Sequence, residues 1–542
     1  MYNKKTNNMR KQICAAGCLA LAALALGACT DSFDSTNTNP NKVTVQSGKM
    51  EASALFEQSL YGSANFFTYY SWFWCDELIQ HTAFTGGTTR QEHRYFIGDQ
   101  NWQSIWNTYA RYASNDVNMV QLAEAQGTDY LRAVGLTMKV LFMSNLTDIY
   151  GDIPYAEAFQ AENGIKTPKF DSQESVYQQM CQELETANAL YATSPYVDPN
   201  KKSLDGMYGF DMAKWRKFNN SLYLRLLCRI SGRSATIVDG QLSVAAKMQQ
   251  IVSRPDEYPI FTSNDDNATV HFTGISPYTS QFDPATYTES SFTTGGYKLT
   301  EQTIKMMVVK ESGNFSHDLY EDPRLKIFGR KNYDYWKGTI AGAAMGEETD
   351  QGNKGAAFLN YKTLCRIDAD EWFMDYAEVQ FILAEAALKG YIGGGEAAAK
   401  DYYEAAQRAS LAKWSDFAAP VDATYAISDE AATEFLASDL ASWDKATTAA
   451  AKAELIANQK YLALFWTGME DWHEYRRTGY PVLTIGSGCV YNDMILPTRF
   501  AYPNTTVATN RANVDEALQR MGGENNMKTP VWWSKQAIEE GK

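Results

Sequence analysis

The sequence predicts a mainly α-helical protein built on a scaffold of helix pairs, with one long irregular region. Apolar residues recur at three- and four-residue spacing from Leu131 to Leu141, from Val176 to Ala187 and from Tyr376 to Ala386. This spacing places an apolar stripe on one helix face. Glycines at 390 and 393–395 then separate the third stretch from an Ala-rich segment, Glu396 to Lys413. Such a hairpin is typical of tetratricopeptide-like arrays, although no strict repeat period is present.

The first 50 residues form a targeting segment. Lys4, Lys5, Arg10 and Lys11 precede an apolar run from Ile13 to Leu26, which is shorter than the roughly 20 residues of a transmembrane helix. Small residues and then Cys29 follow, which predicts a lipoprotein signal peptide over residues 1–28 and lipidation at Cys29. The alternative is a soluble secreted protein in which Cys29 is incidental. Residues 29–50 are polar and turn-rich, which predicts a flexible tether before a folded domain over residues 51–542.

Helices of the scaffold are expected to begin after polar capping residues. Asp171 precedes Glu174, and Asp370 precedes Phe373, at positions that suit helix starts. Between residues 255 and 362 the helical pattern fades, and Thr, Ser, Asn, Gly and Tyr dominate. Loops of this length in a compact domain are usually functional. We therefore expect a loop-rich insertion that lies across the helical scaffold.

Composition excludes some partners. The net charge of −15 argues against nucleic acid, which needs clustered Lys and Arg, and against adhesion to anionic lipid through a basic patch. Aromatic residues make up 13% of the chain, which suits stacking on sugar rings and suits an aromatic helical core equally well. Five cysteines lie beyond Cys29, without a CxxC pair, which favours buried free thiols over disulfides or zinc.

No motif for a catalytic centre, metal or cofactor is present. The cluster from Glu470 to Glu474 is followed by Arg476 and Arg477, which favours structural salt bridges over acid–base chemistry. The segment Asn264 to Asn267 favours a polar turn over a calcium loop. A glycosidase needs two carboxylates at a fixed separation, and nothing in the sequence singles out such a pair.

Several segments together resemble the SusD/RagB family of outer-membrane lipoproteins, in its SusD-like branch. They follow the lipoprotein site in the order expected of that family, and they are Asn37 to Asn41, Leu146 to Tyr155, Pro168 to Tyr177, Lys214 to Leu226, Tyr376 to Ala386, Glu470 to Pro481, Leu496 to Pro503 and Val531 to Trp533. Each segment alone is a weak signal. Their number and order make the resemblance specific, and it covers nearly the whole chain after Cys29.

The resemblance implies a nutrient-binding lipoprotein at the cell surface, anchored in the outer membrane through lipid only. It implies capture of glycans, or in some relatives peptides, and their delivery to a SusC-like TonB-dependent transporter. No catalysis and no cofactor are implied. The alternative from another class is a lipid-anchored helical glycoside hydrolase or lyase, which production of new reducing ends from glycans would reveal.

Ligand contacts are expected on aromatic residues of loops carried by the helices. Two stretches meet this description, His81 to Trp102 and Phe272 to Trp336. The candidates are Tyr95, Trp102, Tyr278, Tyr287, Tyr333 and Trp336. The alternative for each is that the ring pins its loop to the scaffold. Trp106, Trp215 and Trp472 lie in helical patterns and are expected in the core instead.

Overall fold

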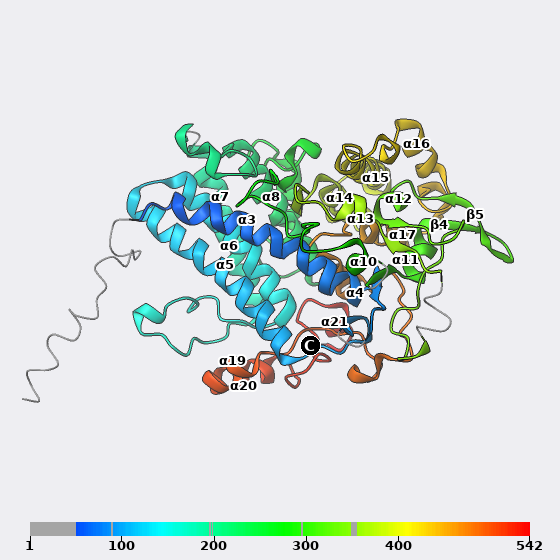
Figure 1. Ribbon diagram of the computed structural model, residues 1–542. Coiled ribbons are helices and arrows are strands. Elements are labelled where there is room, and N and C mark those ends of the chain that lie inside the picture. Colours follow the sequence, from blue (N-terminus) through cyan, green and yellow to red (C-terminus); the bar gives the residue numbers. More distant parts are fainter. Residues whose placement is uncertain are drawn as a thin grey trace, which may run out of the picture. The chain divides into compact units, whose positions relative to one another are not determined.

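The computed structural model describes residues 50–87, 90–194, 197, 199–293, 296–347 and 355–541. The prediction of a mainly α-helical fold is confirmed: helices account for most of the regular structure in these residues (Figure 1). Residues Ala52–Lys542 form one compact unit. The predicted signal peptide, Cys29 and all but the last residue of the predicted tether lie outside the described residues.

The N-terminal half of this unit is a layer of helices, most of them long. They are α3 (Ser53–Tyr70), α4 (Asp76–Leu78), α5 (Asp99–Gln126), α6 (Asp129–Tyr150), α7 (Gln173–Thr193), α8 (Met212–Arg229) and α9 (Val244–Ser253). Helices α5 and α6 are joined by Gly127 and Thr128, and Gly127 takes a left-handed φ of 64° that ends α5. A Cβ on Gly135 of α6 would lie 2.8 Å from Val120 Cγ2 of α5, so glycine allows these two helices to pack closely.

The C-terminal half contains a second set of helices. They are α14 (Tyr376–Leu388), α15 (Gly395–Ala418), α16 (Asp429–Ala437), α17 (Ala449–Ala463), α18 (Glu470–Thr478), α19 (Asn504–Thr509), α20 (Arg511–Arg520) and α21 (Lys535–Glu539). Helices α14 and α15 form the predicted hairpin, and its turn includes Gly394 at a positive φ of 95°. Figure 1 shows α14, α15 and α17 together at the opposite end of the unit from α5 and α6.

Two predicted helix starts need correction. Helix α7 begins at Gln173, because the Ser172 side chain rather than Asp171 accepts the capping hydrogen bond, from Ser175 N–H. Helix α14 begins at Tyr376 with Asp375 as its cap. The predicted start near Phe373 is wrong because Glu371–Met374 forms strand β8, which pairs antiparallel with β2 (Ala268–Val270).

The region predicted as irregular contains short strands and short helices. The helices are α10 (Glu289–Phe292), α11 (Glu301–Met307), α12 (Leu325–Phe328) and α13 (Tyr361–Leu364). Strands β1 (Thr82–Phe84), β3 (Tyr297–Leu299), β7 (Phe358–Leu359) and β6 (Gly329–Arg330) form an antiparallel sheet in that order. Strands β4 (Val308–Glu311) and β5 (Asn314–Glu321) form a hairpin that projects from the body (Figure 1).

The core is rich in aromatic side chains. Trp215 and Trp472 are fully buried, as predicted, whereas Trp106 is only half-buried. Five cysteines are buried free thiols, as predicted: Cys75, Cys181, Cys228, Cys365 and Cys489. Among the described residues, none of the helices combines the length and the apolar character needed to cross a membrane.

Candidate functional site

The structure places neither candidate of the first stretch, Tyr95 or Trp102, on an exposed loop. Tyr95 is fully buried and takes a left-handed φ of 61° directly after the 3₁₀ turn Glu92–Arg94. This turn directs the side chain inward, and burial raises the pKa of its hydroxyl. The expectation of an exposed ring at Tyr95 is therefore corrected. Trp102 lies in the first turn of α5 rather than in a loop and is half-buried, and its carbonyl accepts a hydrogen bond of 2.5 Å from Tyr150 Oη.

The candidates of the second stretch differ in how exposed their rings are. Trp336 is only 3% exposed, so the expectation of an accessible stacking ring is corrected there too. Tyr333 is 43% exposed, and its ring stacks on Tyr335 at a centroid distance of 5.5 Å. Tyr278 and Tyr287 are half-buried and lie in the loop that runs from Phe272 to α10.

That loop is held against α3 by hydrogen bonds. Asn65 of α3 donates from Nδ2 to the carbonyl of Thr279 (3.1 Å) and accepts at Oδ1 from the N–H of Gln281 (2.5 Å). Tyr278 donates its hydroxyl to Glu57 Oε1 (2.5 Å), and its ring lies 4.7 Å from that of Tyr61. Tyr278 therefore also serves to pin the loop.

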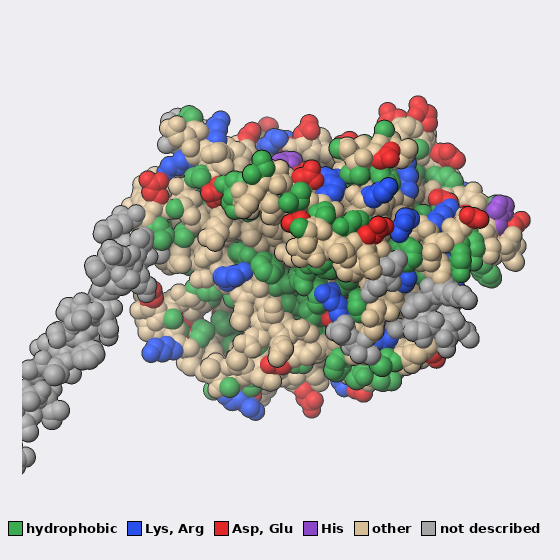
Figure 2. Space-filling model, in the orientation of Figure 1, with side chains coloured by type: hydrophobic (Ala, Val, Ile, Leu, Met, Phe, Trp, Pro, Cys, Tyr) green, Lys and Arg blue, Asp and Glu red, His purple; other side chains and the backbone are tan. Residues whose placement is uncertain are grey.

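An aromatic surface lies beside this loop, at the end of α3. We define the aromatic face as six half-buried residues: Phe66, Tyr69, Phe73, Phe84, Arg90 and Tyr287. Figure 2 shows hydrophobic side chains gathered at the centre of the view, where Figure 1 places the end of α3 near α10. The ring of Tyr69 lies 5.1 Å from that of Phe73, and Tyr287 packs edge-on against Trp72 at 5.4 Å.

Arg90 lies among these rings. Its Cζ is 3.6 Å from the centroid of Phe73 and 5.4 Å from that of Tyr297, which is the geometry of a cation–π contact. Within the described part of the chain no carboxylate forms an ion pair with Arg90, and its buried Nη1 has no hydrogen-bond partner. Aromatic rings beside a cationic donor can stack on a sugar ring and hydrogen-bond its hydroxyl groups.

Buried carboxyl groups hold segments that carry the aromatic face. Glu77 accepts hydrogen bonds from Thr82 Oγ1 (2.8 Å) and from the N–H of Phe84 (2.9 Å), which holds β1 against α4. Burial raises the pKa of Glu77 to about 8 and that of Glu92 to about 7. Glu371, whose pKa burial also raises to about 8, accepts from Ser280 Oγ (3.0 Å) and so anchors the loop above α3.

Sequence reasoning missed Tyr69, Phe73 and Arg90. The signal that could have found the first two is the segment Phe66 to Trp74, in which seven of nine residues are aromatic. A helix cannot turn so many consecutive side chains toward one core, so some must face outward. The segment also passes from α3 into a π-helical turn, Ser71–Cys75, a feature that is frequent at functional sites.

Glu470 and Glu474 lie in a buried ion-pair network, so the structural interpretation of the cluster is confirmed for these two carboxylates, and Asp471 binds buried His81 (2.7 Å). Arg229 pairs with Glu470, with Glu474 (3.0 Å) and with Asp148 (3.3 Å), and all four side chains are buried. Glu474 also pairs with Arg477 (2.6 Å) and with Lys460 (3.0 Å). Despite burial, these cations hold the pKa of Glu474 well below its ordinary value.

Three potential metal ligands, Cys228, Glu385 and Glu474, converge in the same network. Both carboxylates already pair with Arg477, and Glu385 also pairs with Lys389 (2.6 Å). A metal cation there would meet these positive charges, so we assign the cluster a structural role. The Asn264–Asp266 segment is a polar 3₁₀ turn in which Asp266 binds Lys217 (2.8 Å), in agreement with the prediction.

The fold and its surface define a class: a helical scaffold that carries an aromatic-rich surface beside long loops. The profile of the family described as starch-binding and associating with the outer membrane matches residues 40–503, so the chain belongs to the SusD-like family. The resemblance recognised in the sequence is thereby confirmed. No curated protein matches the chain.

Solved structures support the same fold. A SusD homologue of Bacteroides fragilis is 23% identical with a TM-score of 0.72, and the match covers 90% of this chain and 99% of that one. A chitin-binding protein is 25% identical with a TM-score of 0.69, over 89% of this chain and 99% of that one. A chitin-binding SusD homologue of Flavobacterium johnsoniae is 21% identical with a TM-score of 0.69, over 89% and 98% of the two chains.

Proposed function

We propose that this protein is a surface-exposed, non-catalytic lipoprotein of the outer membrane that captures glycans. The observation that carries the proposal is the family match over residues 40–503, since the family is described as starch-binding and outer-membrane-associated. The similarity to chitin-binding structures favours glycans over peptides. Anchoring would be through acyl chains on Cys29, which requires no membrane-spanning helix.

The aromatic face is the proposed contact surface. Its half-buried rings come from a rigid helix and from a loop fastened to that helix, which keeps stacking surfaces in place before a ligand arrives. Of the residues predicted from the sequence, Tyr287 belongs to this surface. Tyr333 is exposed but is not part of it.

Delivery to a SusC-like TonB-dependent transporter is the proposed next step. A stable assembly of this kind requires an interface of roughly 2,000 Å² or more in total. Affinity purification from outer membranes solubilised in mild detergent should recover the transporter together with this chain. Recovery of this chain alone at low salt would remove the transporter from the proposal and leave glycan capture standing.

The test of capture is titration of the purified protein with soluble starch and chitin oligosaccharides, uronic-acid and sulfated oligosaccharides, and a peptide mixture. We expect saturable binding to a glycan, with no new reducing ends after long incubation. Binding to peptides alone would contradict the proposal. Release of reducing ends would instead favour the alternative of a lipid-anchored glycoside hydrolase or lyase.

A further inference from the structure

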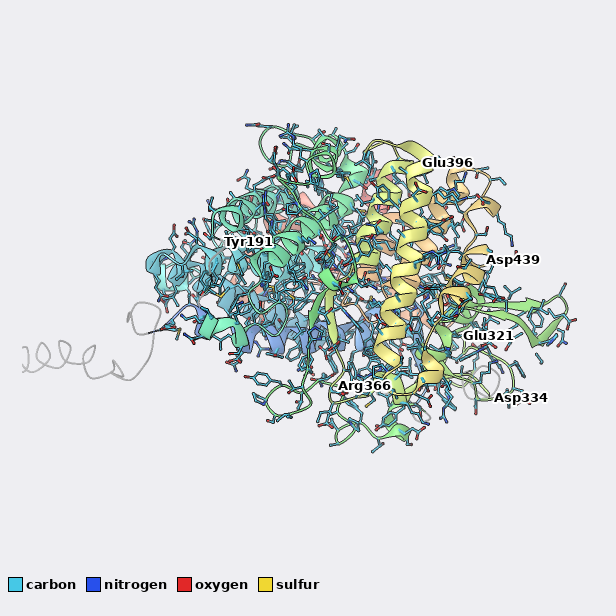
Figure 3. The ribbon with its side chains drawn as sticks, turned by 90° about the horizontal axis from the view of Figure 1, so that it is seen from above. Tyr191, Glu321, Asp334, Arg366, Glu396 and Asp439 are labelled. Atoms are coloured by element: carbon cyan, nitrogen blue, oxygen red, sulfur yellow. The ribbon has the colours of Figure 1, made fainter. Side chains whose placement is uncertain are left out.

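A second surface feature of interest is a cavity of about 380 Å³ beside α12 and α13, which we call the basic pocket. Its lining combines cations, hydrogen-bonding groups and aromatic rings: Glu289, Glu321, Lys326, Gly329, Arg330, Lys331, Trp336, Asn360, Tyr361, Lys362 and Tyr425. Figure 3 shows Glu321 at the foot of the β4–β5 hairpin, where β5 ends at the pocket. The four cations in this lining outnumber the two carboxylates, in a chain whose net charge is −15.

Two of the four cations are neutralised. Lys331 pairs with Glu321 (2.5 Å) and with Asp318 (3.3 Å), and Arg330 pairs with Glu289 (3.3 Å). The other two are not. Among the described residues, Lys326 donates only to the carbonyls of Thr424 (2.7 Å) and Ala426 (3.1 Å). Lys362 forms no ion pair with a described residue, although its positive charge contributes to the lowered pKa of Asp422.

Hydrogen-bonding groups surround these lysines. Asn360 donates from Nδ2 to the hydroxyl of Tyr425 (3.1 Å), so both side chains are fixed in the wall of the pocket. Trp336 forms another part of the wall, and its buried Nε1 has no hydrogen-bond partner among the described residues. A buried donor without a partner is uncommon and costs free energy. Cations, fixed donors and an aromatic wall are the groups that a site for an acidic sugar requires.

The basic pocket and the aromatic face share a wall. The ring of Phe292 in α10 stacks on Trp72 at 5.6 Å and lies 5.8 Å from the ring of Tyr361. Tyr361 also donates its hydroxyl to the carbonyl of Tyr287 (2.8 Å). Tyr287 belongs to the aromatic face and Tyr361 lines the pocket, so one extended ligand can contact both.

We propose that the basic pocket binds an anionic group, a carboxylate or a sulfate, of an acidic glycan whose chain extends over the aromatic face. This inference rests on the proposed function and narrows its ligand to acidic glycans. Lys326 and Lys362 attract an isolated anionic group at short range, and the half-buried position of Lys326 strengthens its share of that attraction.

The test compares three probes by isothermal titration calorimetry on the purified full-length protein. They are galacturonate oligosaccharides, which carry carboxylates, carrageenan oligosaccharides, which carry sulfates on a neutral backbone, and uncharged chitin oligosaccharides. We expect at least one acidic probe to bind about tenfold or more tightly than the uncharged probe. The stronger of the two acidic probes identifies the anionic group. Raising the salt concentration should weaken the binding of the acidic probes only.

Substitutions then locate the site. Lys326→Gln combined with Lys362→Gln should reduce affinity for the acidic probe by about tenfold or more and leave the uncharged probe unaffected. Lys445→Gln is the matched control, since Lys445 is an exposed lysine paired with Asp439 outside the pocket. Glu289→Gln removes the partner of Arg330 and should increase affinity for the acidic probe, a gain that misfolding cannot produce.

Two negative results are distinguishable. If uncharged glycans bind as tightly as acidic ones and the lysine variants change nothing, the inference is overturned and glycan capture stands. If no glycan of either kind binds, both the inference and the proposed function fail. The assignment of this pocket is also overturned if substitutions in the aromatic face change the affinity for the acidic probe and substitutions of Lys326, Lys362 and Glu289 do not.

Discussion

Replacing Arg229 with Met tests whether the buried ion network holds the two halves of the helical unit together. Arg229 of α8 is the shared cation of Glu470, Glu474 and Asp148, and each side chain is at most 9% exposed. Methionine fills similar space without charge, so the substitution leaves three buried carboxylates short of a partner. Removing one member of a buried pair typically costs about 3–5 kcal/mol. We expect a loss of that size in the free energy of unfolding.

The assay is urea unfolding at pH 7, followed by tryptophan fluorescence. Arg511→Met is the matched control, because Arg511 forms an exposed pair with Asp515 (2.8 Å), which contributes about 0.5 kcal/mol or less. Adding Glu470→Met to Arg229→Met should restore part of the loss, since it removes one of the unpaired charges. Equal losses for Arg229→Met and Arg511→Met would show that the buried network does not hold the two halves together.

Three further predictions concern pH, burial and anchoring. Between about pH 6.5 and pH 8 the free energy of unfolding should fall by on the order of 2 kcal/mol. The reason is that buried Glu77 and Glu371, with pKa values of about 8, keep protons that the unfolded chain has released. A urea midpoint that does not change over this range would contradict this. The buried histidines His81, His93 and His473 offset only part of the loss, about 0.4 kcal/mol each, because the unfolded chain half-protonates them at pH 6.5 and releases those protons by pH 8. Tyr95→Ala should lower the free energy of unfolding by about 3–5 kcal/mol without changing glycan affinity. Unchanged stability with weaker glycan binding would show that Tyr95 contacts the ligand. Cys29→Ala should abolish fatty-acid labelling and release the protein from membranes, whereas a variant that still labels would disprove lipidation at this residue.

The helical scaffold could be predicted from the sequence because helix periodicity is local. The stripe from Val176 to Ala187 lies in α7, and the glycines at 393–395 end at the start of α15. Strand β8 could not be predicted, because its residues Glu371–Met374 carry no alternating pattern and are all buried. Its partner β2 lies about a hundred residues away in the chain, and such pairing leaves no local signal.

The candidate site was only partly predictable, because composition marks aromatic residues without telling which way they face. Tyr95 and Trp336 lie in segments that resemble exposed loops, yet both are buried by tertiary packing. Tyr287 was correctly placed in a loop, and the structure adds Tyr69, Phe73 and Arg90 from the end of α3 and from the chain after β1. The contact between Arg90 and the rings depends on β1 pairing with β3, which the sequence does not reveal.

The most direct measurement of the central claim is the affinity of Tyr69→Ala and Tyr287→Ala for the glycan that the unsubstituted protein binds. We expect each substitution to weaken binding by about tenfold or more, since a stacking ring is lost, while the urea midpoint stays nearly unchanged. Tyr402→Ala, at a half-buried tyrosine of α15, is the matched control and should leave binding intact. Unchanged glycan affinity in both variants would show that the aromatic face does not bind the glycan.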